Sequence, residues 1–131
     1  MREFNLQIVT PDGVKFDGMA ESVLVRTDDG DVQVLAGHVD YIASLGIGRA
    51  KLTVGGQTRL ASVSGGFISV SGGECKIVSV TFEFREDIDL ERAKRAKENA
   101  ERLIREAKND KELLVAEAKM KRAISRIDVA S

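Results

Sequence analysis

Three arginines in the C-terminal half are the residues whose type and spacing point most directly to chemistry. Arg122 and Arg126 are four positions apart, so they lie on one face of any helix that contains them. If the chain after Arg92 folds as an antiparallel helix pair, the end of the second helix returns beside the start of the first. The three guanidinium groups then converge, and they repel one another unless an anion lies between them. The spacing therefore predicts an anion site, for which a polyphosphate is the natural ligand.

The same basic residues also have other readings. Lys119 and Lys121 extend the cluster, and no acidic residue occurs between positions 118 and 127. Such a basic face can bind an acidic protein surface instead, and a chain with two states could use both partners. Asp89 and Arg92 taken alone also fit a structural role, because an acidic residue at a helix N-terminus complements the helix dipole and an exposed Arg is solvated.

Few residues in the chain are suited to catalysis. Cys75 is the single cysteine, so no intramolecular disulfide or Cys-based metal site can form, which fits a reducing cytoplasm. It lies in an apolar run, and we expect it to be buried and unreactive. His38, the single histidine, could partner a catalytic carboxylate, but no Ser or Cys nucleophile motif accompanies it. No glycine pair is followed by Lys-Ser or Lys-Thr ahead of a helix, so the sequence has no phosphate-binding loop of the Walker type. We expect any bound nucleotide to be sensed rather than hydrolysed.

The elements that must position these residues change in type near Phe84. All 12 glycines, the single proline and all aromatic residues lie at or before this position. Short runs rich in Val, Ile and Phe alternate there with glycine pairs, whereas Ala, Leu, Glu, Lys and Arg dominate the rest of the chain. The composition predicts an α+β protein with an antiparallel β-sandwich over 1–85 and an antiparallel two-helix hairpin over 86–131.

Turn signals divide the first part at the spacing that is typical of a small sandwich. Pro11-Asp12-Gly13 supplies one turn, and Gly55-Gly56 predicts the clearest hairpin because glycine tolerates the positive φ that tight hairpin turns require. The strands are predicted over 4–9, 23–26, 32–35, 49–54, 59–64, 67–71 and 75–84.

Two alanine-rich stripes at helical spacing predict the helices of the second part. Asn109 can cap the second helix, and Glu112 can reach back to it as in a capping box. Alanine stripes bury little apolar area, so the hairpin needs a host surface, and a segment with alternative hosts is a candidate switch. The first stripe contains Leu90, Ala93, Ala96, Ala100, Leu103, Ile104 and Ala107. The second contains Leu113, Ala116, Met120, Ala123, Ile124 and Ile127.

Charge and hydropathy narrow the class of protein. The formal net charge is -1 and is evenly divided between the two parts, which argues against a dedicated nucleic-acid binder. No apolar run approaches the ~20 residues needed to span a bilayer, and no signal-peptide pattern opens the chain. We expect a soluble protein that can still dock on a membrane complex.

Three motifs, in order, resemble those of the epsilon subunits of bacterial F-type ATP synthases. The motifs are Thr10-Pro11-Asp12-Gly13, the stretch Gly-Asp-Val-Gln-Val-Leu-Ala-Gly-His over 30–38, and Val63-Ser64-Gly65-Gly66-Phe67. The junction at 86–89 and the helical hairpin follow them, so the resemblance covers essentially the whole chain.

The resemblance implies a non-catalytic rotor subunit of the central stalk, peripheral to the cytoplasmic face of the membrane. Its sandwich would bind the gamma subunit and contact the membrane c-ring. The extended hairpin would reach the catalytic beta subunits and oppose ATP hydrolysis, and the folded hairpin would release this inhibition. The implied partner-binding residues are Asp31, His38, Lys119 and Lys121.

The resemblance also implies regulatory ATP, with or without Mg²⁺, that favours the folded hairpin. ATP-binding members of the family carry Ile or Leu, Asp, two free positions, Arg and Ala, and positions 88–93 satisfy this pattern in full. Glu83, Ile88, Asp89 and Ala93 would hold the adenine and ribose. Arg92, Arg122 and Arg126 would hold the phosphates.

Four departures from the family pattern qualify these expectations. Asn99 and Val115 stand where ATP-binding relatives carry helpful basic residues, which predicts weaker ATP binding. Ala36 replaces a usual proline and Gln33 a common glycine, which predicts a less rigid ring-facing loop. A coupling subunit without useful ATP affinity remains the alternative in the same complex. The alternative of another class is a free-standing nucleotide sensor or small enzyme that uses His38.

Overall fold

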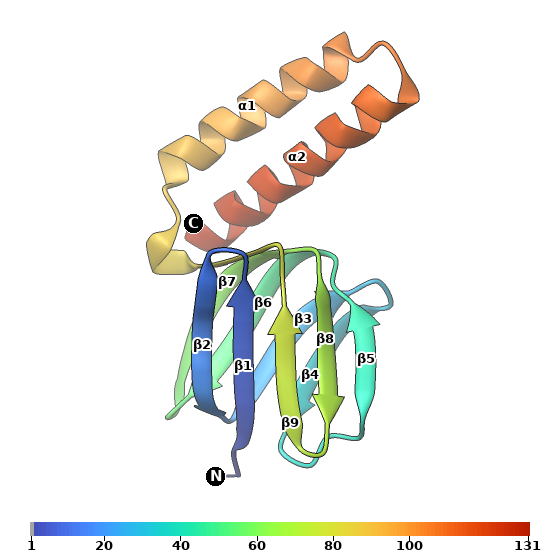
Figure 1. Cartoon of the computed structure of the whole chain (residues 1–131). Helices are drawn as coiled ribbons and strands as arrows, with labels where there is room; N and C mark the ends of the chain where they lie inside the picture. Colours follow the sequence, from blue (N-terminus) through green and yellow to red (C-terminus); the bar gives the residue numbers. More distant parts are fainter. Residues whose placement is uncertain (1) are drawn as a thin grey trace.

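The computed structural model describes residues 2–131, and within this range ten strands precede a short 3-10 helix and two α-helices (Figure 1). The strands form two five-stranded sheets, and the helices lie beyond one end of the resulting sandwich. The predicted α+β class is therefore confirmed. The strands are β1 (Phe4–Thr10), β2 (Gly13–Ala20), β3 (Ser22–Thr27), β4 (Gly30–Leu35), β5 (Tyr41–Ser44), β6 (Ile47–Val54), β7 (Gln57–Ser64), β8 (Phe67–Ser71), β9 (Glu74–Val78) and β10 (Thr81–Phe84).

The first sheet has the order β2-β1-β9-β8-β5, in which β1 and β9 are parallel and the other pairs are antiparallel. Both of its edge strands, β2 and β5, are missing from the strands that the sequence predicts. β2 is mostly exposed and β5 is only four residues long, so neither carries the continuous apolar alternation of a central strand. Pairing with one neighbour alone explains why their sequence signal is weak.

The second sheet has the order β10-β7-β6-β3-β4 and is antiparallel throughout. β6 and β7 form the predicted hairpin: Gly55 and Gly56 have φ of 57° and 78°, and Val54 pairs with Gln57. Alternate residues of both sheets point inward and fill the core, as the period-2 pattern requires. Phe82 and Phe84 meet edge to face in it, with ring centroids 5.3 Å apart.

The predicted single strand over 75–84 is wrong, because this run forms two strands in different sheets. β9 belongs to the first sheet and β10 to the second, and Ser79 and Val80 carry the chain between them. Ser79 is buried, and its hydroxyl lies 2.6 Å from the carbonyl oxygen of Thr81 and 3.0 Å from that of Gly65. These contacts satisfy the polar side chain at the crossing.

The helical hairpin begins after the 3-10 helix η1 (Arg85–Asp87) and consists of α1 (Leu90–Glu106) and α2 (Asp110–Ala130), packed against each other. The Asn109 side chain accepts a hydrogen bond from the Glu112 backbone N–H at 2.8 Å, as predicted. The reciprocal bond differs from a capping box, since the Glu112 carboxylate accepts from the Lys108 N–H. Neither helix in the described range is long and apolar enough to cross a membrane.

The hairpin meets the sandwich through α2, which packs against β6, β7 and η1. The contacts come from the C-terminal part of α2, which lies on the outer face of the second sheet, while the rest of the hairpin extends beyond the end of the sandwich (Figure 1). The predicted stripe is buried at Ala116 and Ala123, but Ile124 is 47% exposed. Ser125 and Val129 are buried instead. The predicted stripe assumes that α2 packs against α1 alone. Because α2 also packs against the sheet, residues outside that stripe are buried as well.

Candidate functional site

A cleft of about 540 Å³ lies where the sandwich meets the base of the hairpin, between β10, η1, α1 and α2. The β1–β2 hairpin forms a further wall. Six of the seven predicted ATP-binding residues line this cleft: Glu83, Ile88, Asp89, Arg92, Ala93 and Arg126. The fold therefore brings together residues from both parts of the chain, as the antiparallel hairpin predicts.

Arg126 and Glu83 face each other across the junction. The Arg126 Nε donates a hydrogen bond to Glu83 Oε1 at 2.7 Å, and their side chains are 28% and 32% exposed. Glu83 points outward because it alternates with the core residues Phe82 and Phe84 on β10. The guanidinium that the resemblance assigns to phosphate is thus paired with a carboxylate that it assigns to the adenine side.

Asp89 has the structural role that the sequence predicts at the start of α1, whereas the side chain of Arg92 is available to a ligand. The Asp89 carboxylate caps α1 by accepting a hydrogen bond from the Arg92 backbone N–H at 3.1 Å. The Arg92 side chain takes part in no hydrogen bond or ion pair within residues 2–131, and it lines the cleft. Asp89 thus fixes the start of α1, which places an uncommitted guanidinium at the cleft.

The convergence of three arginines is incomplete, because Arg122 is not among the residues that line this cleft. Lys119 and Val115 line a separate cavity of about 410 Å³ between the helices. Asn99 accepts a hydrogen bond from Arg102 at 2.6 Å on α1. Asn99 and Val115 thus lie outside the cleft. Basic residues at these two positions would not line it in this arrangement, so their absence does not change the charge of the lining.

The β1–β2 hairpin contributes three lining residues that were not predicted: Thr10, Asp12 and Lys15. The motif Thr10-Pro11-Asp12-Gly13 predicts a turn, and its turn chemistry is present, since the Thr10 hydroxyl accepts a hydrogen bond from the Asp12 N–H at 3.2 Å. No local pattern in the sequence indicates that this turn faces a helix about eighty residues later. Lys15 takes part in no ion pair in the described part of the chain.

The residues of the cleft fit the chemical groups of a nucleotide in size and type. Its volume is within the range of roughly 300–1,000 Å³ that is typical of small-ligand sites. Ile88 and Ala93 offer apolar surface, carboxylates accept from an amino group, and arginine suits phosphate. The lining holds three basic and four acidic side chains, however, so the cleft is not strongly basic. No group of three His, Cys, Asp or Glu residues suited to a metal ion occurs in residues 2–131.

Polar pairs join α2 to the sheet beside the cleft. The buried Ser125 and Ser62 hydroxyls are hydrogen-bonded at 2.8 Å. The Arg49 Nη1 lies 3.6 Å from Asp128 Oδ2, in a pair whose side chains are about half exposed. Together with the Arg126–Glu83 pair, these contacts give the interface between α2 and the sheet three polar pairs.

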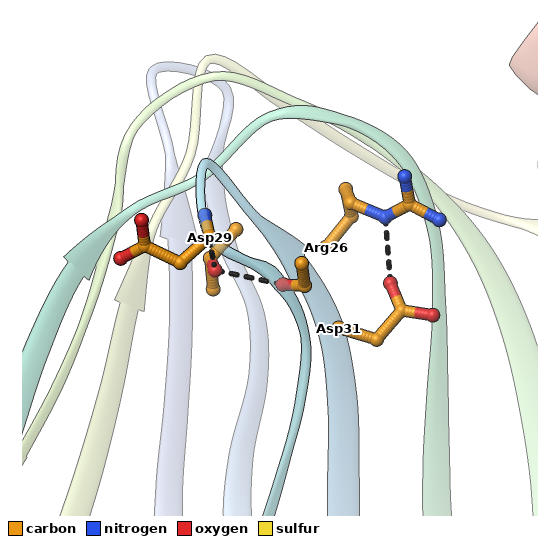
Figure 2. A network of polar contacts seen from close by, with 5 residues as sticks. Arg26, Asp29 and Asp31 are labelled. Carbon is orange, nitrogen blue, oxygen red and sulfur yellow. Dashed lines mark hydrogen bonds and ion pairs between the residues drawn. The ribbon is translucent and has the colours of Figure 1, made fainter.

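The two predicted partner-binding residues of the sandwich lie near opposite ends of β4. Figure 2 shows Asp31 next to the β3–β4 turn, where it accepts a hydrogen bond from the Arg26 Nε at 2.6 Å. His38 follows the other end of β4, and its ring packs edge to face on Tyr41 with centroids 5.8 Å apart. On α2, Lys121 is exposed. These residues therefore do not form one surface.

The chain thus has two parts, a β-sandwich and a helical hairpin docked on it through α2, with a ligand-sized cleft at their junction. The model of the ATP synthase Delta/Epsilon chain β-sandwich domain matches residues 3–85, and that of its long α-helix domain matches residues 86–131. The chain belongs to the ATP synthase delta/epsilon chain family, which confirms the resemblance in the sequence.

Individual relatives agree with the family models. The ATP synthase epsilon chain of Bacillus velezensis is 42% identical over 130 residues, covering 99% of this chain and 98% of the relative. That of Bacillus licheniformis is 41% identical and covers 99% of both chains. A chain in a structure of the Euglena gracilis mitochondrial ATP synthase, with OSCP, F1 and the c-ring, has a TM-score of 0.84 at 24% identity, covering 98% of this chain and 81% of that one. At this identity, the structural match supports the fold alone.

Proposed function

We propose that this chain is a non-catalytic central-stalk subunit of an F-type ATP synthase, which couples rotation to catalysis and inhibits ATP hydrolysis through a movable C-terminal hairpin. Its sandwich binds the gamma subunit and the c-ring at the cytoplasmic face of the membrane, and its extended hairpin reaches the catalytic beta subunits. ATP in the cleft favours the folded hairpin. Family membership supports the stalk role, and the similar Euglena gracilis chain belongs to an assembly that contains F1 and the c-ring.

The composite lining of the cleft is the observation that carries the regulatory part of the proposal. Glu83 comes from β10, Arg92 from α1 and Arg126 from α2. A site made from both parts exists only while the hairpin is docked, so a ligand that binds there stabilises the docked state by mass action. A ligand at 100 times its dissociation constant adds about 2.7 kcal/mol to that state.

The polar character of the docking interface supports reversible movement. The Ser62–Ser125, Arg49–Asp128 and Glu83–Arg126 pairs can each exchange their partner for water when the hairpin leaves. Exposed ion pairs contribute little net stability, and a net hydrogen bond contributes about 1 kcal/mol. Breaking these three pairs therefore costs little free energy, which favours a switch over a permanently fused domain.

A coupling subunit without useful ATP affinity is the second candidate. The excess of acidic over basic residues in the cleft and the engagement of Arg126 by Glu83 favour it. In that case, the basic residues of α2 act only on acidic surfaces of partner subunits.

Calorimetric titration of the isolated chain with ATP separates the two candidates. We expect the unmodified chain to bind, and Arg92→Ala and Arg126→Ala each to weaken binding about tenfold or more, because a hydrogen bond to a charged group is worth about 1.5–3 kcal/mol. Arg102→Ala is the matched control, since Arg102 lies on α1 outside the cleft and pairs with Glu106. An unmodified chain that does not bind would favour the coupling role. Binding that neither cleft variant alters would remove the phosphate assignment.

A further inference from the structure

A second groove, of about 430 Å³, is lined by residues of β6, β7 and η1 and has a clearly basic lining. Arg49 and Lys51 reach it from β6, Arg59 from β7 and Arg85 from η1. Glu86 is its one acidic lining residue. This distribution contrasts with the cleft at Glu83, so the two sites favour ligands of different charge.

Two of the four basic side chains, Arg59 and Arg49, contact neighbouring residues, and the other two have no ion-pair partner in the described chain. The Arg59 guanidinium stacks 3.7 Å above the centroid of Phe84, and its Nε donates a hydrogen bond to Glu86 at 3.0 Å. The hydrogen bond from Arg59 also holds the pKa of Glu86 below its ordinary value. Arg49 makes only the 3.6 Å contact with Asp128. Lys51 and Arg85 take part in no ion pair within residues 2–131, so the groove keeps a positive charge that its own acid does not balance.

The groove also borders a stretch of free sheet edge. β10 pairs with residues 61–64 of β7 only, whereas β6 pairs with all of β7. Residues 57–60 therefore have a strand neighbour on the β6 side alone within the described chain. The short helix η1 contacts β7, but it makes no backbone hydrogen bond to residues 57–60. Thr58, Arg59 and Leu60 of this stretch line the groove. An edge of this kind presents unpaired backbone groups that can accept another strand.

We propose that this groove binds an extended acidic segment of a partner polypeptide, which adds to the free edge of β7 and places carboxylates beside Lys51 and Arg85, the two lining cations that take part in no ion pair within residues 2–131. The charge of the lining selects an acidic ligand, and the edge selects a polypeptide over a small anion. The one aromatic ring nearby, Phe84, is covered by Arg59, so the groove offers no free stacking surface for a nucleotide base. This site is separate from the cleft and does not depend on ATP binding.

Fluorescence anisotropy of the full chain with a labelled peptide in which Glu and Thr alternate tests the proposal. Alternation puts every Glu on one face of an added strand. We expect saturable binding at low salt that weakens as salt is added, and no binding of the matching Lys-Thr peptide. The double variant Lys51→Gln with Arg85→Gln should weaken binding roughly fivefold, as expected for two exposed charges. Hydrogen exchange at the amides of 57–60 should slow when the peptide is bound.

The control variant carries Lys76→Gln and Lys108→Gln, which change the net charge equally at exposed positions outside the groove. Its affinity for the acidic peptide should match that of the unmodified chain. Failure of the acidic peptide to bind, or equal weakening in both double variants, would overturn the proposal. Binding of inorganic tripolyphosphate at Lys51 and Arg85 with no peptide protection at 57–60 would also overturn it, since a small-anion site would then explain the groove.

Discussion

Lys15 shows how a residue far away in sequence can join a site that local patterns assign to other residues. Lys15 lines the cleft with Arg92 and Arg126, and unlike Arg126 it has no ion-pair partner in the described chain. Asp12 lies in the same lining and offsets part of this charge. A bound polyphosphate would therefore gain a modest contact from the β1–β2 hairpin.

At this residue, we predict that Lys15→Gln weakens ATP binding by roughly two- to fivefold, as expected for one exposed charge pair. Adenosine binding should stay unchanged, because the ammonium can attract only the phosphates. Calorimetry with both ligands measures the difference, with Lys76→Gln as a control of equal charge on β9 outside the cleft. An equal loss of affinity for ATP and adenosine would contradict this role.

Cys75 provides a second test at the residue scale. Burial raises the pKa of its thiol to about 12, from an ordinary value of 9.0. Between these values the unfolded chain loses the thiol proton while the folded chain keeps it, so the free energy of unfolding falls as pH rises through this window. Urea unfolding should show a smaller fall in Cys75→Ala than in the unmodified chain. Parallel pH profiles for the two proteins would contradict the assignment of this effect to Cys75.

At the scale of elements, the turn between β7 and β8 depends on a close backbone approach. A Cβ at Gly66 would overlap the carbonyl oxygen of Val78 and lie 2.7 Å from the Ser79 Cα, and Gly66 has φ of 96°. The chain that crosses between the sheets at Ser79 therefore passes directly over this glycine. This packing gives a physical reason for a glycine at this position of the Val63–Phe67 motif.

We predict that Gly66→Ala lowers the free energy of unfolding by about 2 kcal/mol or more, through backbone strain and overpacking together. Gly56→Ala is the matched control, because Gly56 also has positive φ but nothing within 4 Å of the added Cβ. It should lose only about 1–2 kcal/mol. Urea or thermal unfolding measures both variants, and a Gly66→Ala protein as stable as Gly56→Ala would rule out the steric account.

The same elements show what the sequence could and could not predict. The β6–β7 hairpin was predictable because its two glycines and its alternating strands lie next to each other. The break within 75–84 could not be predicted, because both halves of this run are rich in strand-forming residues. Only tertiary packing places β9 and β10 in different sheets. For the helices, spacing placed Arg122 and Arg126 together, but the docked orientation of α2 decides that only Arg126 lines the cleft.

At the scale of the whole molecule, two candidate surfaces, the cleft and the basic groove, adjoin the region where α2 docks. The cleft draws residues from both parts of the chain, whereas the basic groove is lined by residues of β6, β7 and η1 and by none of α2. One lining residue, Arg49, pairs with Asp128 of α2. Ligands of the cleft should therefore favour docking strongly. A ligand of the groove that competes for Arg49 should affect docking only weakly.

Hydrogen exchange along α2, compared without ATP and with saturating ATP, tests the coupling of the cleft to hairpin position most directly. At an ATP concentration 100 times the dissociation constant, amides that exchange through undocking should slow by up to about 100-fold. Arg92→Ala at the same ATP concentration should show much less protection. Identical exchange of α2 with and without ATP, in a chain that calorimetry shows to be saturated, would contradict the account.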